Sequence, residues 1–296
     1  MTAAQALQYA LSGVTVGSIY AITAIGFNII YSTTGVINFA QGEFAVIGAL
    51  TAISLVGHMP LGAAVALAVA ITAALGALIE LLVVRRVKQA SVLRLVVVTI
   101  GLSIVLREAA LHVWDEKVHC LPFFTGNEVS SIAFLGAHIS PQVLWVLGTC
   151  SAMVALLAAF FRFTATGRAM RACAANATAA RLCGVNVRAM VTLSFTLSAA
   201  LGALAGCVIS PVTQTQYDMG APLAIKGFTA AILGGLGNSA GAVGAGLTIG
   251  LLEAFSVSVL PLAYQDAVSI AVLLLVLVFR PHGLFTRRDA GQLAEK

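Results

Sequence analysis

The sequence predicts an all-α, polytopic membrane protein with eight or nine transmembrane segments, some of them short or discontinuous. Of the 296 residues, 60% are hydrophobic and only 9% are charged, whereas soluble domains average about a quarter charged. The apolar residues fall in long runs, and the basic residues cluster between them. A water-soluble globule cannot hide this much apolar surface beneath a polar exterior, so most of the surface must face lipid.

Nine apolar segments are candidates for these spans, because a transmembrane helix needs about 20 predominantly apolar residues. They are residues 8–31, 44–57, 61–84, 93–112, 143–161, 189–212, 223–236, 240–258 and 264–279. Three of them, 44–57, 223–236 and 264–279, are short for a full crossing, and we interpret them as half-helices or tilted, re-entrant pieces. All nine belong to a single predicted transmembrane domain over residues 1–296.

The basic residues predict the orientation of the chain. Thirteen of the 16 lie in three clusters: Arg85, Arg86, Lys88 and Arg94; Arg162, Arg168, Arg171, Arg181 and Arg188; and Arg280, Arg287, Arg288 and Lys296. The positive-inside rule places all three in the cytoplasm, which gives a cytoplasmic loop at 162–188 and a cytoplasmic tail at 280–296. The N-terminus is outside if the first three segments all cross, and inside if 44–57 only dips into the membrane.

Polar residues interrupt the apolar pattern in the stretch from Gly35 to Phe44. Asn38, Gln41 and Glu43 lie there beside two glycines. Unwound backbone and polar side chains are tolerated at membrane depth where they line a water-filled cavity, so this stretch is a candidate for a solute pathway. The alternative is a cytoplasmic turn followed by a helix whose dipole favours Glu43 in its first turn.

A second interruption is the glycine-rich stretch Gly227–Ala242. Paired, glycine-interrupted apolar segments in the two halves of a chain indicate the solute pathway of a transporter. Close packing of helices in lipid is the alternative, and it suits Gly241, Gly246 and Gly250.

The cytoplasmic loop contains the alanine-rich stretch Gly167–Asn186. Its alanines favour a helix over 168–184, and Gly184 supplies a C-terminal stop. This helix would present small side chains to a groove on a partner, with arginines at the rim. An amphipathic helix that lies on anionic lipid explains the pattern equally well.

The remaining charges and the cysteines support no catalytic or metal site. Lys226 and Glu253 flank the glycine-rich segment, and we expect them to anchor helix ends at the membrane interface rather than to contact a ligand. Glu80, one turn before Arg85, is expected to pair with that loop. Five scattered cysteines without metal-ligand spacing read as small buried hydrophobes.

These motifs resemble the branched-chain amino acid ABC transporter permease family. The similar segments are GSIYAITAIGFNIIY (17–31), GVINFAQGEF (35–44), RACAANATAARLCGVN (171–186), FTAAILGGLGNSAGAVGAG (228–246) and FRPHGLF (279–285). They occur in the family's order, from about residue 10 to residue 287. The chain departs from the pattern at Ala174 and Ala175, where an acidic residue is frequent, and at Gln41, where a His is common.

The resemblance implies a bacterial inner-membrane importer that carries branched-chain amino acids or related small polar solutes inward. It implies a second homologous permease subunit, two cytoplasmic ATPase subunits and a periplasmic substrate-binding protein as partners. Urea, amides and aromatic acids remain alternative solutes. The sequence lacks the phosphate loop G-x-x-x-x-G-K-[ST], so we expect no cofactor on this chain, with ATP and Mg bound by the ATPase subunits, and no nucleic acid as partner.

The expected site residues follow from the same motifs. For the substrate pathway they are Asn28, Asn38, Gln41, Glu43, Gly234, Gly235, Gly237 and Asn238. For coupling to the ATPase they are Arg168, Arg171, Ala175, Asn176, Ala179, Ala180 and Gly184. An ion-coupled secondary transporter is the main rival, but such carriers usually place functional charges in mid-membrane. An intramembrane enzyme would need a nucleophile with a base or a set of metal ligands, and no such motif is present.

Overall fold

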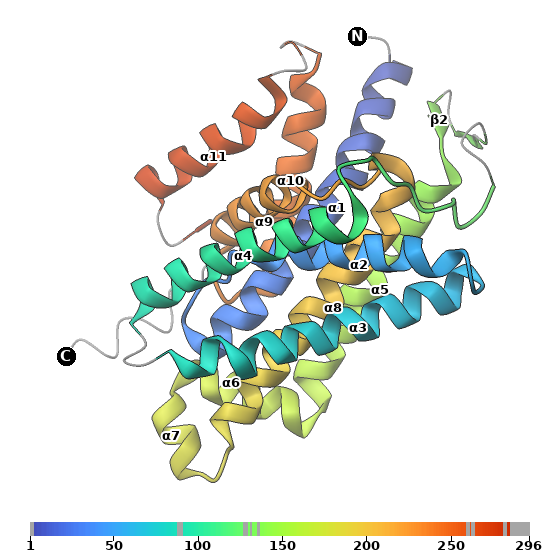
Figure 1. Cartoon of the computed structure of the whole chain (residues 1–296). Helices are drawn as coiled ribbons and strands as arrows, with labels where there is room; N and C mark the ends of the chain where they lie inside the picture. The colour runs from blue at the N-terminus through green and yellow to red at the C-terminus, as the bar shows by residue number, and fades with distance from the viewer. Residues whose placement is uncertain are drawn as a thin grey trace.

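All nine predicted apolar segments are helices in the computed structural model, which describes residues 3–87, 91–126, 130, 132–134, 137–258, 261, 264–280 and 283–284 (Figure 1). They are α1 (Ala3–Thr34), α2 (Gln41–Val56), α3 (Leu61–Leu82), α4 (Val92–Trp114), α5 (Pro141–Phe163), α8 (Val187–Thr213), α9 (Gly220–Gly234), α10 (Ser239–Ser256) and α11 (Gln265–Phe279). Lys88, Glu128 and nearly all of the predicted tail after Arg280 lie outside the described residues. The fold is all-α and polytopic, as predicted.

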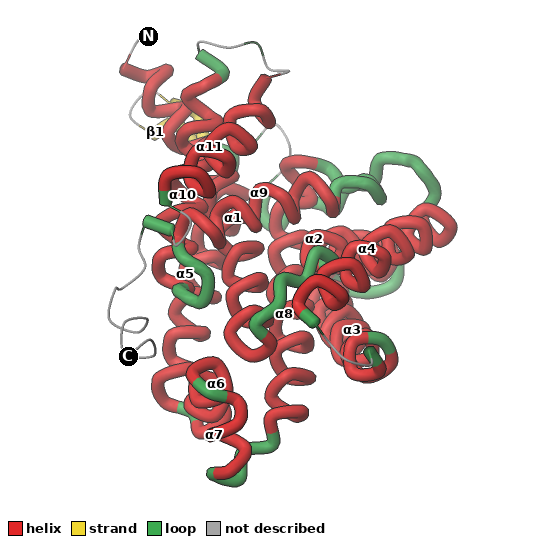
Figure 2. The backbone as a smooth tube through the Cα atoms, turned by 90° about the vertical axis from the view of Figure 1, so that its left-hand side faces the viewer, coloured by secondary structure: helices red, strands yellow, loops and turns green. Residues whose placement is uncertain are grey.

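The other elements are short and connect the apolar helices. A 3₁₀ turn, η1 (Val84–Arg86), follows α3, and two helices, α6 (Ala165–Ala175) and α7 (Ala177–Leu182), join α5 to α8. The strands β1 (Ile132–Phe134) and β2 (Ala137–Ile139) pair antiparallel between α4 and α5. In both views α6 and α7 project at the end of the molecule away from the N-terminus (Figures 1 and 2).

Length separates three short apolar helices from the other six, of which α4 has 23 residues. In the described part of the chain, five spans are long and apolar enough to cross a membrane: Gln5–Thr34, Leu61–Arg86, Pro141–Phe163, Val187–Thr213 and Ser239–Ser256. Helices α2, α9 and α11 are apolar but have only 16, 15 and 15 residues. At 1.5 Å per residue they are about 22–24 Å long, which is less than the roughly 30 Å hydrocarbon core of a bilayer.

The centre of the fold consists of α1 and α2. Every residue from 17 to 30 and from 40 to 50 is buried, so neither helix has an exposed face in these stretches, and both lie in the interior of the bundle. Around them pack α3, α5, α8, α9 and α10, and the exposed leucines, isoleucines and valines lie largely on α3, α4, α5 and α11.

Glycines allow a close crossing between α1 and α10. A Cβ atom added at Gly246 would lie 2.5 Å from the backbone nitrogen of Ala21, and one added at Gly17 would lie 2.8 Å from the carbonyl oxygen of Gly246. Gly250 likewise lies against the backbone of Gly13 and Gly17. The alternative reading of these glycines as packing residues is therefore confirmed for Gly246 and Gly250.

The α1–α10 crossing makes a testable prediction about stability. Gly246→Ala adds one carbon where the backbone leaves no room, and overpacking of this kind costs about 1–3 kcal/mol. Gly101→Ala in α4 is the matched control, because nothing lies within 4 Å of the added carbon. We expect thermal unfolding in detergent to show a loss of stability for Gly246→Ala alone. Equal stability of the two variants would contradict the crossing.

Candidate functional site

The amide of Gln41 connects three helices at the centre of the fold. Its Nε2 donates to the carbonyl oxygen of Ser198 on α8 at 3.1 Å. The Ser198 hydroxyl donates to the carbonyl oxygen of Gly26 on α1 at 2.8 Å and contacts Gln41 Oε1. The Gln41 side chain is fully buried. It therefore joins α1, α2 and α8, and the sequence pattern gave no sign that Ser198 was its partner.

The carboxylate of Glu43 is buried where the first turns of α2 and α9 meet. Ser103 Oγ donates to Glu43 Oε1 at 2.9 Å, and a Cβ atom added at Gly220, the first residue of α9, would collide with the carboxylate. Helix N-termini favour negative charge, and Glu43 lies in the first turn of α2 as well. Glu43 therefore lies in the first turn of α2, where the helix-dipole interpretation expected it, and also beside the first turn of a second helix.

Two asparagines retain hydrogen-bonding capacity in the interior. Asn28 Oδ1 accepts from the Gly237 nitrogen at 3.1 Å, and Asn38 Oδ1 accepts from the Ala40 nitrogen at 3.2 Å. Within the described residues, the Nδ2 atoms of both are buried without a hydrogen-bond partner. Asn38 lines a cavity of about 30 Å³, which is enough for a water molecule. Asn28 and Asn38 were both expected to line the substrate pathway, and the Nδ2 atom of each can still donate a hydrogen bond.

The glycine-rich segment forms the turn between α9 and α10. Gly235 and Gly237 have φ angles of 88° and 87°, in the left-handed region that only glycine adopts readily. Asn238 caps α10 by accepting from the Gly241 nitrogen at 3.1 Å. Gly234 packs tightly against α10 at Gly241. Asn28 binds the turn through Gly237, so the first motif and the glycine-rich motif meet there.

The predicted single helix over 168–184 is wrong, because two helices cover this range. Asn176 has φ −160° and ψ 103°, and its Oδ1 accepts from the nitrogens of Thr178 at 3.0 Å and Ala179 at 2.9 Å. The asparagine side chain thus ends α6 and caps α7, since asparagine competes with the helix for backbone hydrogen bonds. The predicted stop at Gly184 is confirmed, with φ 85°.

Small and basic residues on this α6–α7 segment differ in exposure. Arg168, Arg171, Ala175 and Ala179 are exposed, whereas Ala180 faces inward and is only 5% exposed. Leu182, which the sequence analysis did not single out, is 86% exposed at the end of α7. The Cys173 side chain in α6 is buried, and this burial raises the pKa of its thiol.

A cavity of about 1110 Å³ lies between the α6–α7 segment, the end of α1 and the α9–α10 turn. Its lining combines Ala175 and Asn176 with Gly237 and Asn238. We call it the Asn176 cavity. The structure therefore brings residues expected for coupling and for the substrate pathway to the walls of the same cavity.

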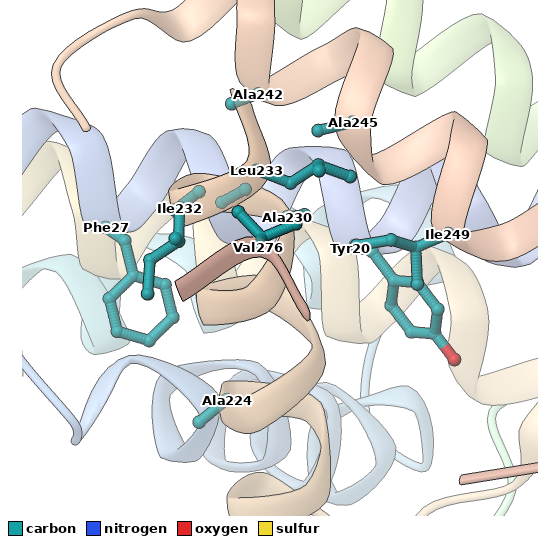
Figure 3. Packing of buried hydrophobic residues seen from close by; sticks show 12 residues of the cluster. Tyr20, Phe27, Ala224, Ala230, Ile232, Leu233, Ala242, Ala245, Ile249 and Val276 are labelled. Atoms are coloured by element: carbon teal, nitrogen blue, oxygen red, sulfur yellow. The ribbon is translucent and has the colours of Figure 1, made fainter. Parts of the chain in front are cut away.

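A charged cluster lies elsewhere, among α1, α9, α10 and α11. It consists of Tyr20, Lys226, Glu253, Asp266 and Ser269. Glu253 was expected to anchor a helix end at the interface, and this is wrong, because its side chain is 1% exposed and forms an ion pair with Lys226 at 3.2 Å. Figure 3 shows the Tyr20 hydroxyl pointing away from the other labelled side chains of its apolar cluster. Sequence spacing could not reveal that these charges pair across helices.

The predicted pairing of Glu80 is confirmed. Arg85 Nε lies 3.4 Å from Glu80 Oε1, and Thr192 on α8 donates to Glu80 Oε2 at 2.7 Å. This buried carboxylate ties the end of α3 to the start of α8.

Comparison with protein families gives a match over almost the whole chain. Residues 9–277 match the family described as branched-chain amino acid transport system / permease component. This chain belongs to that family. The match covers the polar start of α2, the α6–α7 segment and the glycine-rich turn, and it confirms the resemblance seen in the sequence.

Several curated relatives are similar along nearly their full length. The high-affinity branched-chain amino acid transport system permease protein BraD of Pseudomonas aeruginosa is 36% identical over 97% of this chain and 98% of its own. The corresponding protein LivH of Escherichia coli K12 is 35% identical over 97% of each chain. The ribose import permease protein RbsC of E. coli K12 is more distant, at 26% identity over 80% of this chain and 74% of its own.

A solved structure shares the fold. One chain of PsaBC from Streptococcus pneumoniae in complex with Fab aligns with a TM-score of 0.52 at 12% identity, covering 94% of this chain and 92% of that one. At this identity the likeness concerns the arrangement of helices alone.

The cap at Asn176 makes a second prediction. Asn176→Ala removes the acceptor for two backbone amides of α7, a loss that costs about 1 kcal/mol, and we expect those amides to exchange with solvent about fivefold faster. Asn176→Asp keeps the acceptor and the protection. Asn186→Ala, which uncaps α8 at Ala189, is the control for a distant cap. Unchanged exchange in Asn176→Ala would contradict the assigned break between α6 and α7.

Proposed function

We propose that this chain is the membrane-spanning permease of an ABC importer that moves branched-chain amino acids inward across the bacterial inner membrane. The observation that carries the proposal is full-length similarity to permease proteins named for this transport, at 35–36% identity without large gaps in coverage. The match to the more distant ribose permease indicates that related chains carry other small solutes, so the solute class is tested directly by competition.

The orientation follows if the arginine-rich α6–α7 segment is cytoplasmic. The Asn176 cavity is lined by residues 31–35 at the end of α1 as well as by this segment, so α1 ends on the cytoplasmic side. The N-terminus lies at the opposite end of the molecule (Figure 1), which supports an N-terminus on the outer side of the membrane. Near the other terminus, the Leu284 nitrogen donates to the carbonyl oxygen of Leu233 beside the α9–α10 turn, so the chain leaves the membrane on the cytoplasmic side.

The expected partners and cofactors follow from the separate roles of the subunits in an ABC importer. A second homologous permease would complete the pathway, two cytoplasmic ATPases would bind ATP and Mg, and a periplasmic binding protein would deliver the solute. The α6–α7 segment, with exposed Ala179 and Leu182, is the surface that meets an ATPase.

Reconstitution tests this assignment. In liposomes, this chain alone is expected neither to hydrolyse ATP nor to take up leucine, whereas the complete complex is expected to take up leucine only with ATP and the binding protein. Uptake of radiolabelled leucine in competition with urea, amides and aromatic acids measures the solute class. Leucine uptake by the single chain, driven by an ion gradient, would instead establish a secondary carrier.

The docking of α7 is tested by Ala179→Trp. If α7 fits into a groove on the ATPase, the bulky side chain overpacks the contact by about 1–3 kcal/mol, and we expect less ATPase to co-purify and less substrate-stimulated ATP hydrolysis. If α7 only lies on lipid, an interfacial tryptophan is favourable and assembly is retained.

Leu156→Trp is the control for this experiment, because Leu156 is an exposed residue of α5 in a membrane span. It adds the same side chain away from the α6–α7 segment. Normal assembly and stimulated hydrolysis in Ala179→Trp would argue against a tight contact at α7.

A further inference from the structure

A second cavity, of about 350 Å³, lies beside the charged cluster. Its walls come from α1, α2, α8, α9 and α11, and most of them are apolar, including Val16, Ile19 and Leu223. Two charged residues also line it, Lys226 and Asp266. We call it the Lys226 cavity. Its volume is in the range of small-molecule sites, which are typically about 300–1,000 Å³ and apolar with a few placed polar groups.

The two carboxylates of the cluster differ in how they are held. Glu253 is buried and accepts from the Tyr20 hydroxyl at 2.7 Å and from the Ser269 hydroxyl, in addition to its ion pair with Lys226. Asp266 lies 2.7 Å from Lys226 Nζ, but its side chain is 72% exposed. Glu253 is thus a fixed internal partner of the ammonium group, and Asp266 is the outer one.

The charges in this cluster do not balance. One ammonium group, of Lys226, lies against two carboxylates, of Glu253 and Asp266. The hydrogen bonds of Tyr20 and Ser269 reduce the cost of the Glu253 charge, and a further hydrogen bond joins Lys226 Nζ to the Tyr20 oxygen at 3.1 Å. Asp266, which is exposed and lines the cavity, is therefore the carboxylate of the cluster that the ammonium group of a ligand can reach.

A zwitterion satisfies this arrangement without a net change of charge. Its ammonium group can bind Asp266 while its carboxylate binds Lys226, so the single Lys226–Asp266 ion pair is replaced by two ion pairs. Lys226 keeps its bonds to Glu253 and Tyr20 in the exchange. The ligand's aliphatic side chain then contacts the apolar walls. A neutral amide, urea or sugar offers neither charge.

We infer that the Lys226 cavity is a site for the zwitterionic group of an α-amino acid, with Lys226 and Asp266 as its charged contacts. The inference rests on the proposed function and adds to it a location and two charged contacts. The cavity also reaches Thr213, Gln214 and Met219, which are exposed at the end of α8 remote from α6 and α7. This is the end at which a solute would arrive from outside.

Protection of an engineered thiol tests the site. Thr213→Cys places a thiol at the cavity, Cys120→Ser removes an exposed native thiol, and the complete importer in liposomes is treated from outside with a membrane-impermeant thiol reagent. Leucine is expected to slow labelling as 1 + [L]/Kd, which is about elevenfold at ten times the midpoint concentration. Leucinamide, which lacks the carboxylate, and urea are expected to change the rate less than twofold at the same concentration.

Charge variants identify the contacts. Lys226→Gln and Asp266→Asn should each abolish protection by leucine, and Lys226→Arg and Asp266→Glu should restore part of it. Ser269→Ala is the matched control, because it removes a hydrogen bond to Glu253 without changing the cavity wall. Full protection in both neutral variants, or loss of protection in Ser269→Ala to the same extent, would overturn the assignment in favour of a purely structural cluster.

The comparison of leucine with leucinamide and urea uses Thr213→Cys with Lys226 and Asp266 unchanged. It therefore tests the site even if a charge variant does not assemble. Equal protection by leucine and leucinamide there would overturn the inference. ATP-driven leucine uptake by the unmodified complex distinguishes failure of this site from failure of the proposed function. Uptake without any protection at Thr213→Cys would refute this site and leave the proposed function intact, whereas absence of uptake would refute both.

Discussion

The close approach of helix backbones at glycine is the constraint on which the rest of this structure depends. In lipid, apolar side chains gain little by leaving their surroundings, so helices associate through tight packing and hydrogen bonds. Gly17 and Gly246 allow α1 and α10 to touch backbone to backbone, and Gly206 does the same for α8 against Ala45 of α2. Larger residues here would separate the helices and open the interior that α1 and α2 fill.

This tight centre explains how polar groups can be buried in it. Because α2 begins inside the bundle, its first turn meets the first turn of α9, where the absence of a side chain at Gly220 leaves space for the Glu43 carboxylate. Gln41 and Ser198 satisfy one another between the same helices. Short helices with buried N-termini thus place a carboxylate and an amide at depth, and each finds partners that a full-length span would not supply.

Sequence patterns predicted much of the architecture and less of the site. Each of the nine apolar segments predicted from the sequence is a helix in the structure. The stop at Gly184 followed from the ability of glycine to adopt a positive φ angle at a helix end. The break at Asn176 was missed because the prediction of one helix over 168–184 relied on the alanine content and did not consider that Asn176 could cap a second helix. The pairing of Glu253 with Lys226 and Tyr20 depends on the crossing of α1, α9 and α10, and no local spacing encodes it. Intramembrane charge was the available signal, but it was interpreted as interfacial.

Helix α9 links the two cavities. Lys226, at the wall of one, and Gly234, which adjoins the turn at the wall of the other, are eight positions apart on one helix, or about 12 Å along its axis. The turn that follows is held to α1 by the bond between Asn28 and the Gly237 nitrogen, and the N-terminal residue of α9 abuts Glu43. α9 is a continuous helix without an internal proline kink, since Pro222 lies in its first turn. A rigid displacement of its C-terminal end would therefore carry Lys226 with it, and would alter the charged wall of one cavity and the glycine turn of the other together.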